Sequence, residues 1–253
     1  MIDVHCHLTD PRLEGYAPEE SVSIITTGTS VEDSEKAVEL AEKFDNVLAC
    51  VGIHPEEIQD SNNKYINQPL REQIQILKQL TKHPKVVGIG EVGLDFRSET
   101  KPEEKSGQKK LFEAMVGLAE ETGLPIVVHN RNADEDVLKI LEGVKTGVLM
   151  HCFTRGREFM QKCAERGWYM SFGGLVTYEN NPRMKIVVRE LPAEWLLLET
   201  DAPYSVPAGV KSDINTPMNV KIVAEKVAEI RGVAAGYIDE LTSANAGRLF
   251  KLT

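Results

Sequence analysis

Eight short apolar runs alternate with helical segments along the chain, and this alternation is the feature that most restricts the fold. Such runs, rich in β-branched residues, are typical of strands buried on both faces. They span residues 1–7, 22–28, 47–54, 86–93, 124–130, 147–153, 168–174 and 195–201. Strands that alternate with helices favour a parallel sheet with right-handed crossovers. An eightfold alternation in 253 residues fits a closed α/β barrel of the TIM type, (β/α)8, better than an open doubly wound sheet.

The segments between the runs carry helix signals. Ser30 and Asp33 form a start that resembles a capping box for a helix over 30–44. Gly123 is placed to end a helix over 109–123. Further helices are expected over residues 69–80, 132–142, 156–166, 216–231 and 237–251.

No composition break or low-complexity stretch marks a linker, so we expect one barrel domain over residues 1–253. No G-x-G-x-x-G motif follows the first run, which weakens the dinucleotide-binding alternative. The formal net charge of −10 argues against a general nucleic-acid coat or a binder of anionic membranes, because both need a basic surface. We also expect a cytoplasmic protein without membrane contact or an obligate protein partner, because neither a spanning segment nor a signal peptide is evident.

The cysteines have no C-x-x-C spacing, and each lies in apolar or strand-like sequence. We therefore expect four reduced, buried thiols that bind no metal. Cys6 and Cys152 are each next to a candidate metal ligand and should point away from the metal site. The four are Cys6, Cys50, Cys152 and Cys163.

Polar residues interrupt the first run at alternate positions, so strand geometry predicts Asp3, His5 and His7 on one face. The other face would carry Ile2, Val4, Cys6 and Leu8. In a barrel of this type the active site lies at the carboxyl ends of the strands. Of the six histidines only His83 lies away from these ends. Buried imidazoles each need a partner, so five histidines that converge on one rim indicate a metal site.

The residue types at the strand ends predict how the metals would be held. His5 and His7 can bind one ion together, and Glu91 has two oxygens that can bridge two ions. His129 and His151 can complete a second site. Asp201, at the end of the eighth run, can bind the first ion and accept a proton from its water. Imidazole and carboxylate ligands suit Zn²⁺, Mn²⁺, Fe²⁺ or Co²⁺, and Mg²⁺ suits the carboxylate-rich side. A site with open positions for water is hydrolytic rather than structural.

The ordered set of motifs resembles the TatD family of metal-dependent deoxyribonucleases, within the amidohydrolase superfamily. The motifs are "DVHCHL", "GIHP", "GEVGLD", "LPIVVHNRNADEDVL", "HCF", "LETDAPY" and "NTP". The resemblance covers essentially the whole chain. It implies metal binding by His5, His7, Glu91, His129, His151 and Asp201, and hydrolysis of phosphodiester bonds in DNA.

Two loops depart from the family pattern. Thr154 and Arg155 follow "HCF", where the family usually continues Ser-Gly. Before "NTP" the family commonly carries Arg-Gly-Lys, whereas this chain has "VPAGVKSDI", which leaves Lys211 as the nearby cation. Arg131 is placed to bind a phosphate bidentately. Arg155, Lys211 and Arg97 are further candidates for substrate binding.

Other polar residues near the strand ends are expected to support the site. His54 is interpreted as a phosphate contact or as the acid for the leaving group, with a structural role as the alternative. Glu199 is expected to orient a ligand histidine or to hydrogen-bond His54. Asp3 and Asp95 are expected to lie behind the ligands or in turns. Asn215, Thr216 and Pro217 also fit a helix start.

The leading prediction is a two-metal hydrolase of phosphate esters, a deoxyribonuclease that acts through a metal-activated water. Glu91, Asp201 and His54 would take part in the chemistry, with Asp201 as the base. An acidic protein can hold DNA only through a local field, and a narrow barrel mouth favours single-stranded ends over an internal duplex bond. One alternative is hydrolysis of a carboxylic ester such as D-aminoacyl-tRNA. The other is a non-catalytic metal-binding module, which the presence of a base such as Asp201 opposes.

Overall fold

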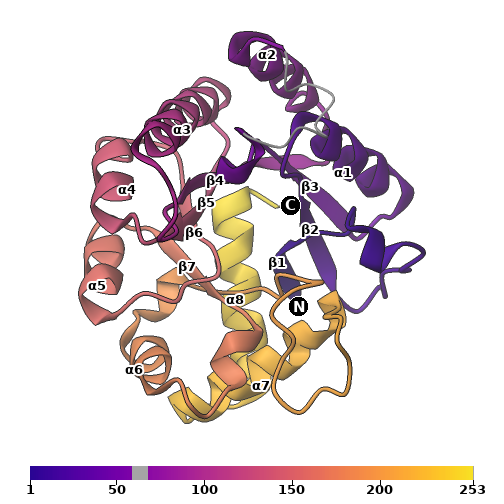
Figure 1. Ribbon diagram of the computed structural model, residues 1–253. Coiled ribbons are helices and arrows are strands. Elements are labelled where there is room, and N and C mark those ends of the chain that lie inside the picture. The colour runs from indigo at the N-terminus through magenta and orange to yellow at the C-terminus, as the bar shows by residue number, and fades with distance from the viewer. Residues whose placement is uncertain (59–67, 253) are drawn as a thin grey trace.

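Eight parallel strands form one sheet in the order in which they occur in the chain. The computed structural model describes residues 1–58 and 68–252. The strands are β1 (Ile2–Cys6), β2 (Ser23–Thr27), β3 (Val47–Val51), β4 (Val86–Asp95), β5 (Ile126–Arg131), β6 (Val148–Met150), β7 (Tyr169–Phe172) and β8 (Leu196–Leu198). Backbone hydrogen bonds from Asp201 N–H to His5 O (2.9 Å) and from His7 N–H to Ala202 O (2.7 Å) join the end of β8 to β1. The predicted TIM-type barrel is therefore confirmed (Figure 1).

Helices follow the strands, and all but the last of them lie around the outside of this barrel (Figure 1). They are α1 (Val31–Lys43), α2 (Leu70–Leu80), α3 (Pro102–Thr122), α4 (Asp134–Ile140), α5 (Arg157–Glu165), α6 (Pro182–Glu190), α7 (Val220–Arg231) and α8 (Ala235–Phe250). Short 3₁₀ turns add η1 (Pro11–Leu13), η2 (Pro55–Ile58), η3 (Gly174–Thr177), η4 (Ala193–Trp195) and η5 (Pro217–Asn219). Within the described ranges no helix combines the length and the apolar character that crossing a membrane requires.

The barrel interior is a packed apolar layer rather than a pore. Each strand contributes one buried residue to a single cluster: Val4, Ile25, Cys50, Val87, Val127, Leu149, Tyr169 and Leu197. Ala246, Leu249 and Phe250 of α8 join the same cluster, and Figure 1 shows α8 lying across the barrel. A separate cluster packs the opposite side of the strands against the other helices. The apolar layer closes the barrel below, so polar side chains can gather only at the carboxyl ends of the strands.

The first strand departs from the predicted alternation. Val4 packs inside the barrel, whereas Cys6 packs between the sheet and the helices. The register of the β1–β2 pairing shifts between Asp3 and Cys6, and such an irregularity re-aims the side chains that follow it. His5 and His7 therefore reach the rim together. Contrary to the prediction, Val4 and Cys6 do not share a face.

Several element boundaries also differ from the prediction. Ser30 caps the helix as expected, since its side chain accepts from Asp33 N–H (3.1 Å), but the Asp33 carboxylate accepts from Thr29 N–H (2.9 Å) instead of from Ser30 N–H. Helix α6 has no counterpart among the expected helices, although Asn181 caps it and Pro182 occupies its first turn. The sixth and eighth strands are only three residues long, because the polar residues at the ends of these runs leave the ladder to form the site.

Candidate metal centre

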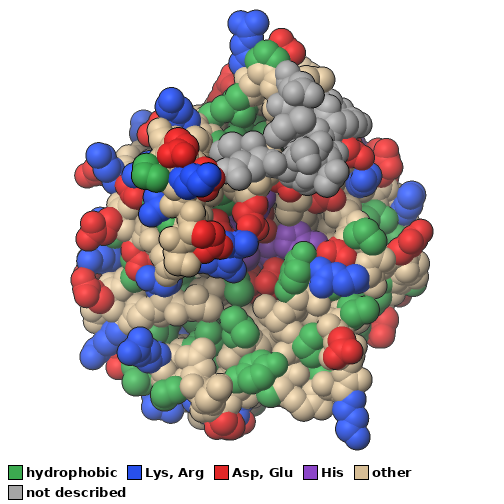
Figure 2. Space-filling view, viewed as in Figure 1, with side chains coloured by type: hydrophobic (Ala, Val, Ile, Leu, Met, Phe, Trp, Pro, Cys, Tyr) green, Lys and Arg blue, Asp and Glu red, His purple; other side chains and the backbone are tan. Residues whose placement is uncertain are grey.

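The carboxyl ends of the strands surround a cavity of about 1120 Å³. Figure 2 shows histidine side chains at the bottom of a hollow in the centre of this face, among acidic and basic side chains. The cavity lining includes five of the six predicted ligands, His7, Glu91, His129, His151 and Asp201. The sixth, His5, is fully buried beneath them. The structure therefore brings the whole predicted set together.

Four side chains converge on one side of the cavity. His5 Nε2 and His7 Nε2 are 3.3 Å apart, and each is 3.5 Å from Glu91 Oε2. Asp201 Oδ1 lies 3.5 Å from His7 Nε2 and 3.9 Å from His5 Nε2. Ligands bound to one ion at about 2.0–2.1 Å in tetrahedral geometry are about 3.3 Å from one another. This first group therefore fits a single divalent cation.

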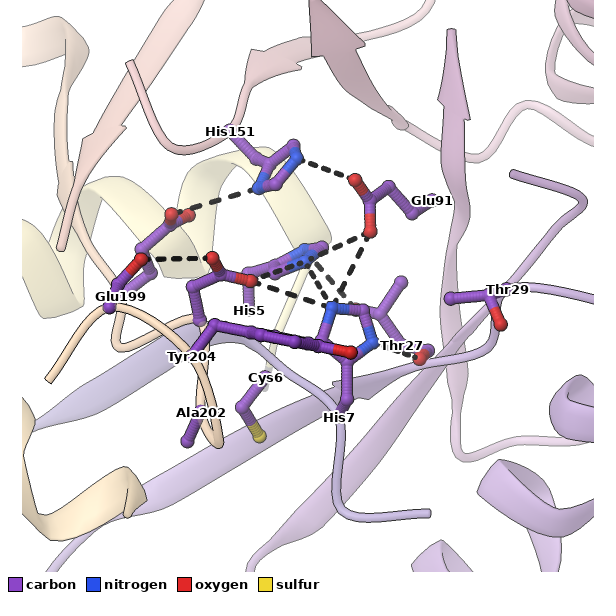
Figure 3. A network of polar contacts seen from close by, with 12 residues as sticks. His5, Cys6, His7, Thr27, Thr29, Glu91, His151, Glu199, Ala202 and Tyr204 are labelled. Atoms are coloured by element: carbon purple, nitrogen blue, oxygen red, sulfur yellow. Dashed lines mark hydrogen bonds and ion pairs between the residues drawn. The ribbon is translucent and has the colours of Figure 1, made fainter. Parts of the chain in front are cut away.

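The other oxygen of Glu91 belongs to a second group. Glu91 Oε1 lies 2.8 Å from His129 Nδ1 and 2.7 Å from His151 Nε2, and the two nitrogens are 3.3 Å apart. These distances are close to those expected between ligands of one small divalent ion. Figure 3 shows Glu91 between His151 on one side and His5 and His7 on the other. The two groups thus share Glu91 and no other residue among these contacts.

Surrounding groups fix which ring nitrogen faces the cluster. His7 Nδ1 lies 3.1 Å from the backbone oxygen of Thr27, so Nδ1 keeps its proton and Nε2 is the nitrogen that would bind a cation once it is deprotonated. His129 Nε2 likewise lies 3.0 Å from Asp95 Oδ2, which leaves its Nδ1 toward Glu91. These are the partners that metal-bound histidines usually have.

Glu199 is placed to orient His151 in a similar way, as one of its two predicted roles required. The Glu199 carboxylate is fully buried, and its Oε1 lies 3.7 Å from His151 Nδ1. Its Oε2 accepts from the Ser171 hydroxyl (2.5 Å). The structure records no hydrogen bond from Glu199 to His54, the other predicted role.

The electrostatics of the cluster favour cations. Burial opposes charge on His7, but Asp201 and Glu91 together raise the pKa of His7 to about 9. Burial also opposes charge on Glu91, yet His151, His54 and His129 hold the pKa of Glu91 well below its usual value. Burial opposes charge on Asp201, but His7, His151 and His5 together lower the pKa of Asp201 as well. Both carboxylates are therefore ionised at neutral pH and attract positive charge.

His54 differs from the other histidines of the rim. Its Nδ1 accepts from Glu56 N–H (3.2 Å), so in the neutral ring the proton is on Nε2, which lies 3.4 Å from Glu91 Oε1. Burial lowers the pKa of His54 and keeps the ring neutral. His54 is thus a hydrogen-bond donor at the edge of the cluster. This arrangement suits the predicted contact to a phosphate or a leaving group better than a metal ligand.

Asp3 lies behind the site, at the seam between the first and last strands. Its carboxylate accepts from Thr200 N–H (2.9 Å), from the Thr200 hydroxyl (2.6 Å) and from His5 N–H (3.3 Å). Thr200 immediately precedes Asp201, so Asp3 links the backbone of two predicted ligands.

Three of the four predicted cationic contacts, all arginines, are already paired with acids. Arg131 Nη1 and Arg97 Nε each lie 3.2 Å from Asp95. Arg155 Nε lies 2.8 Å from Asp134. These three arginines line the cavity, but Lys211 is exposed and does not line it in the described part of the chain. The structure therefore does not bring Lys211 into the site.

The expected orientation of Cys152 is wrong. Cys152 follows β6 with a positive φ of 44° and lines the cavity beside His151. It is only partly buried, whereas Cys6, Cys50 and Cys163 are buried as expected. Because the strand ends before Cys152, the alternation of side chains does not extend to it.

Ser205 and Asn215 make supporting contacts that the sequence did not predict. The Ser205 hydroxyl donates to Asp201 Oδ2 (3.2 Å). The fully buried Asn215 donates from Nδ2 to Thr200 O (2.9 Å) and to Ser205 O (3.3 Å), which holds the loop after β8. The interpretation of Asn215, Thr216 and Pro217 as a helix start is also confirmed, because Pro217 begins η5 and α7 follows directly at Val220. Ser205 is an ordinary loop residue in the sequence and Asn215 belongs to the "NTP" motif, but only their long-range partners reveal these contacts.

Comparison with known proteins agrees with this geometry. A family model described as TatD related DNase matches residues 2–251. The uncharacterized metal-dependent hydrolase YabD of Bacillus subtilis is 36% identical, over 100% of this chain and 99% of YabD. A protein of Salmonella typhimurium named 3'-5' ssDNA/RNA exonuclease TatD is 35% identical, over 90% of this chain and 87% of its own length. The crystal structure of the TatD homologue YJJV from Escherichia coli superposes with a TM-score of 0.88 at 26% identity, over 100% of this chain and 98% of YJJV. The chain therefore belongs to the TatD-related DNase family and is a metal-dependent hydrolase.

Proposed function

We propose that this protein is a nuclease that hydrolyses phosphodiester bonds at the ends of single-stranded DNA with two divalent cations. The observation that carries the proposal is the position of Glu91, whose Oε2 faces His5 and His7 while its Oε1 faces His129 and His151. A pair of ions bridged in this way is typical of enzymes that act on phosphate esters. Family membership speaks against a non-catalytic metal-binding module.

The residues that would hold the ions follow from the distances. His5, His7 and Asp201 would bind one ion, His129 and His151 the other, and Glu91 both. When bound, such ions lower the pKa of a coordinated water and stabilise negative charge on the phosphoryl oxygens. The donor set suits zinc or manganese, and magnesium could replace them only on the carboxylate-rich side.

Asp201 is the proposed base. Its carboxylate is ionised at neutral pH because its pKa is lowered, and its Oδ2 is held by the Ser205 hydroxyl at 3.2 Å. It lines the cavity, so it can accept a proton from an attacking water. His54 Nε2–H, on the far side of Glu91, would donate to a phosphate oxygen or to the leaving group.

The charge of the cavity favours a substrate that makes few phosphate contacts. Its acidic lining residues outnumber the basic ones: Asp10, Asp33, Glu56, Glu57, Glu91, Asp95 and Asp201 against Lys36, Arg97, Arg131 and Arg155. Each arginine already has an acidic partner. A strand end brings fewer charges than a duplex and can enter the cavity. The relatives named 3'-5' ssDNA/RNA exonuclease favour a 3′ end and add RNA as a second substrate.

A hydrolysis assay on linear and circular single-stranded DNA of the same sequence tests this proposal. Duplex DNA, RNA and an aminoacyl ester are run in parallel, each with zinc, manganese and magnesium. We expect nucleotides to be released from linear strands, starting at the 3′ end, and circles to survive. Equal cleavage of circles and linear strands would contradict end dependence. Cleavage of the aminoacyl ester alone would indicate a carboxylic ester as the substrate.

A matched pair of variants assigns the activity to this site. His5→Asn should abolish cleavage because it removes a ligand from the first group. His83→Asn should not affect it, because His83 lies away from the cavity and pairs with Glu42 (3.0 Å).

A further inference from the structure

Tyr204 is an exposed aromatic side chain at the edge of the metal centre. It is 49% exposed and lines the cavity. The other large hydrophobic side chains that the structure shows as exposed, Tyr178, Ile186, Val233 and Tyr237, are not in the cavity lining. The Tyr204 ring centroid lies 5.9 Å from that of His7, with the planes at 80°. Figure 3 shows the tyrosine edge-on beside His7.

The ring is held in place from outside the cavity. The Arg12 guanidinium lies 4.4 Å from the Tyr204 ring centroid. Arg12 is itself fixed by two contacts to Asp10, from Nε to Oδ1 (2.9 Å) and from Nη2 to Oδ2 (2.7 Å). Arg12 does not line the cavity, whereas Tyr204 does. One face of the ring is thus covered by a cation, and the exposed half of the side chain borders the site.

The backbone around Tyr204 is also fixed. Tyr204 N–H donates to Asp201 O (2.8 Å), which ties the ring position to the proposed base. Asn215 N–H donates to Pro203 O (3.0 Å) on the preceding residue. Because half of its side chain is exposed, Tyr204 stabilises the fold less than a fully buried aromatic would. Its fixed position lowers the cost of binding a flat group against the ring.

We propose that Tyr204 is a specificity-determining residue that stacks against the nucleobase next to the cleaved phosphate. This inference rests on the proposed nuclease function and names how the substrate is recognised. Aromatic rings bind single strands by stacking without strong sequence preference, because every base has a π-face. A base within a duplex is already stacked and cannot offer that face, so Tyr204 selects single-stranded ends. Because the arginines of the rim are paired with acids, stacking supplies much of the binding that the charges of the cavity do not.

The test compares two single-stranded oligonucleotides of equal length. One has ordinary ends. In the other, the last two residues at each end are abasic tetrahydrofuran residues, which keep the phosphate backbone but carry no base. Tyr204→Leu should lower kcat/KM on ordinary ends by about 5- to 150-fold and leave it nearly unchanged on ends without bases. Tyr204→Phe keeps the ring and should behave as wild type on both. Tyr237→Leu, which removes an exposed tyrosine of α8 outside the cavity lining, is the matched control.

The outcomes separate this inference from the proposed function. An equal loss on both strands would show that Tyr204 only positions His7 and would overturn the stacking role. No loss on either strand would show that the ring does not touch the substrate. If wild type cleaves neither strand, the nuclease function itself fails and this inference falls with it. The metal content of every variant is measured to confirm that the ligand groups are intact.

Discussion

Replacing Asp3 with alanine should destabilise the barrel at its seam. Asp3 is fully buried and accepts three hydrogen bonds, from Thr200 N–H, the Thr200 hydroxyl and His5 N–H. A buried donor left without a partner costs about 1–3 kcal/mol, so three would cost about 3–9 kcal/mol. Removing a buried carboxylate offsets part of this, since burial raises the pKa of Asp3. We expect a net loss of about 3–5 kcal/mol in the free energy of unfolding.

A second substitution distinguishes the hydrogen bonds from the charge. Asp3→Asn retains an oxygen for the two N–H groups, and its amide can donate to the Thr200 oxygen. It should therefore cost only about 1 kcal/mol. Asp213→Ala, at an exposed loop position, controls for the loss of a carboxylate.

Urea denaturation followed by circular dichroism measures these differences. With a slope of about 3 kcal/mol/M, Asp3→Ala should lower the midpoint by about 1–2 M. If Asp3→Ala and Asp213→Ala differ by less than about 0.5 kcal/mol, the seam does not depend on Asp3 and the reasoning is refuted.

Three further predictions concern the metal centre. Asp201→Asn should leave metal largely bound through the remaining ligands but lower kcat by about 10²–10⁴-fold through loss of the base; near-normal turnover by the metal-loaded variant would remove Asp201 from the mechanism. In the metal-free protein the pKa of His7 is raised to about 9, above its value of about 6.5 in the unfolded chain. The ion pairs of His7 therefore stabilise the fold fully below about pH 6.5, and this stabilisation is lost as the pH rises through 9. A cation must displace that proton, so titrating zinc into weakly buffered apoprotein near neutral pH should acidify the solution, and an unchanged pH would contradict the assigned protonation. Arg131→Ala should weaken binding of single-stranded DNA more than binding of metal, and wild-type binding should vary with salt as if about two to four counterions were released; equal losses for DNA and metal would mean that Arg131 acts only through Asp95.

The sequence predicted the barrel and the convergence of the candidate ligands because both depend on periodic features. Each strand run has a polar residue at or near its carboxyl end, and parallel strands must place those ends on one rim. Val127 of β5 and Leu149 of β6 face the barrel interior, and His129 and His151 lie two residues further along, on the same face. The same periodicity failed at Val4, where a register shift interrupts the alternation, and at Cys152, where the strand has already ended.

Contacts between distant loops could not be predicted from periodicity. Arg155 lines the cavity as expected, but the sequence did not show that it pairs with Asp134 from the preceding strand–helix unit. Lys211 was chosen for its proximity in sequence to "NTP", but the loop holds it away from the cavity. Tyr204 lies within the motif "LETDAPY", and only its position against His7 and Arg12 leads to the stacking role proposed for it.

The metal content of wild type and of Glu91→Gln tests the central claim most directly. Elemental analysis after dialysis against a metal-free buffer should find two divalent ions per wild-type chain. Glu91→Gln should fold normally and lose affinity at both sites, because Glu91 Oε2 faces His5 and His7 while Oε1 faces His129 and His151. A single tight ion per chain, retained unchanged in Glu91→Gln, would contradict the two-metal centre.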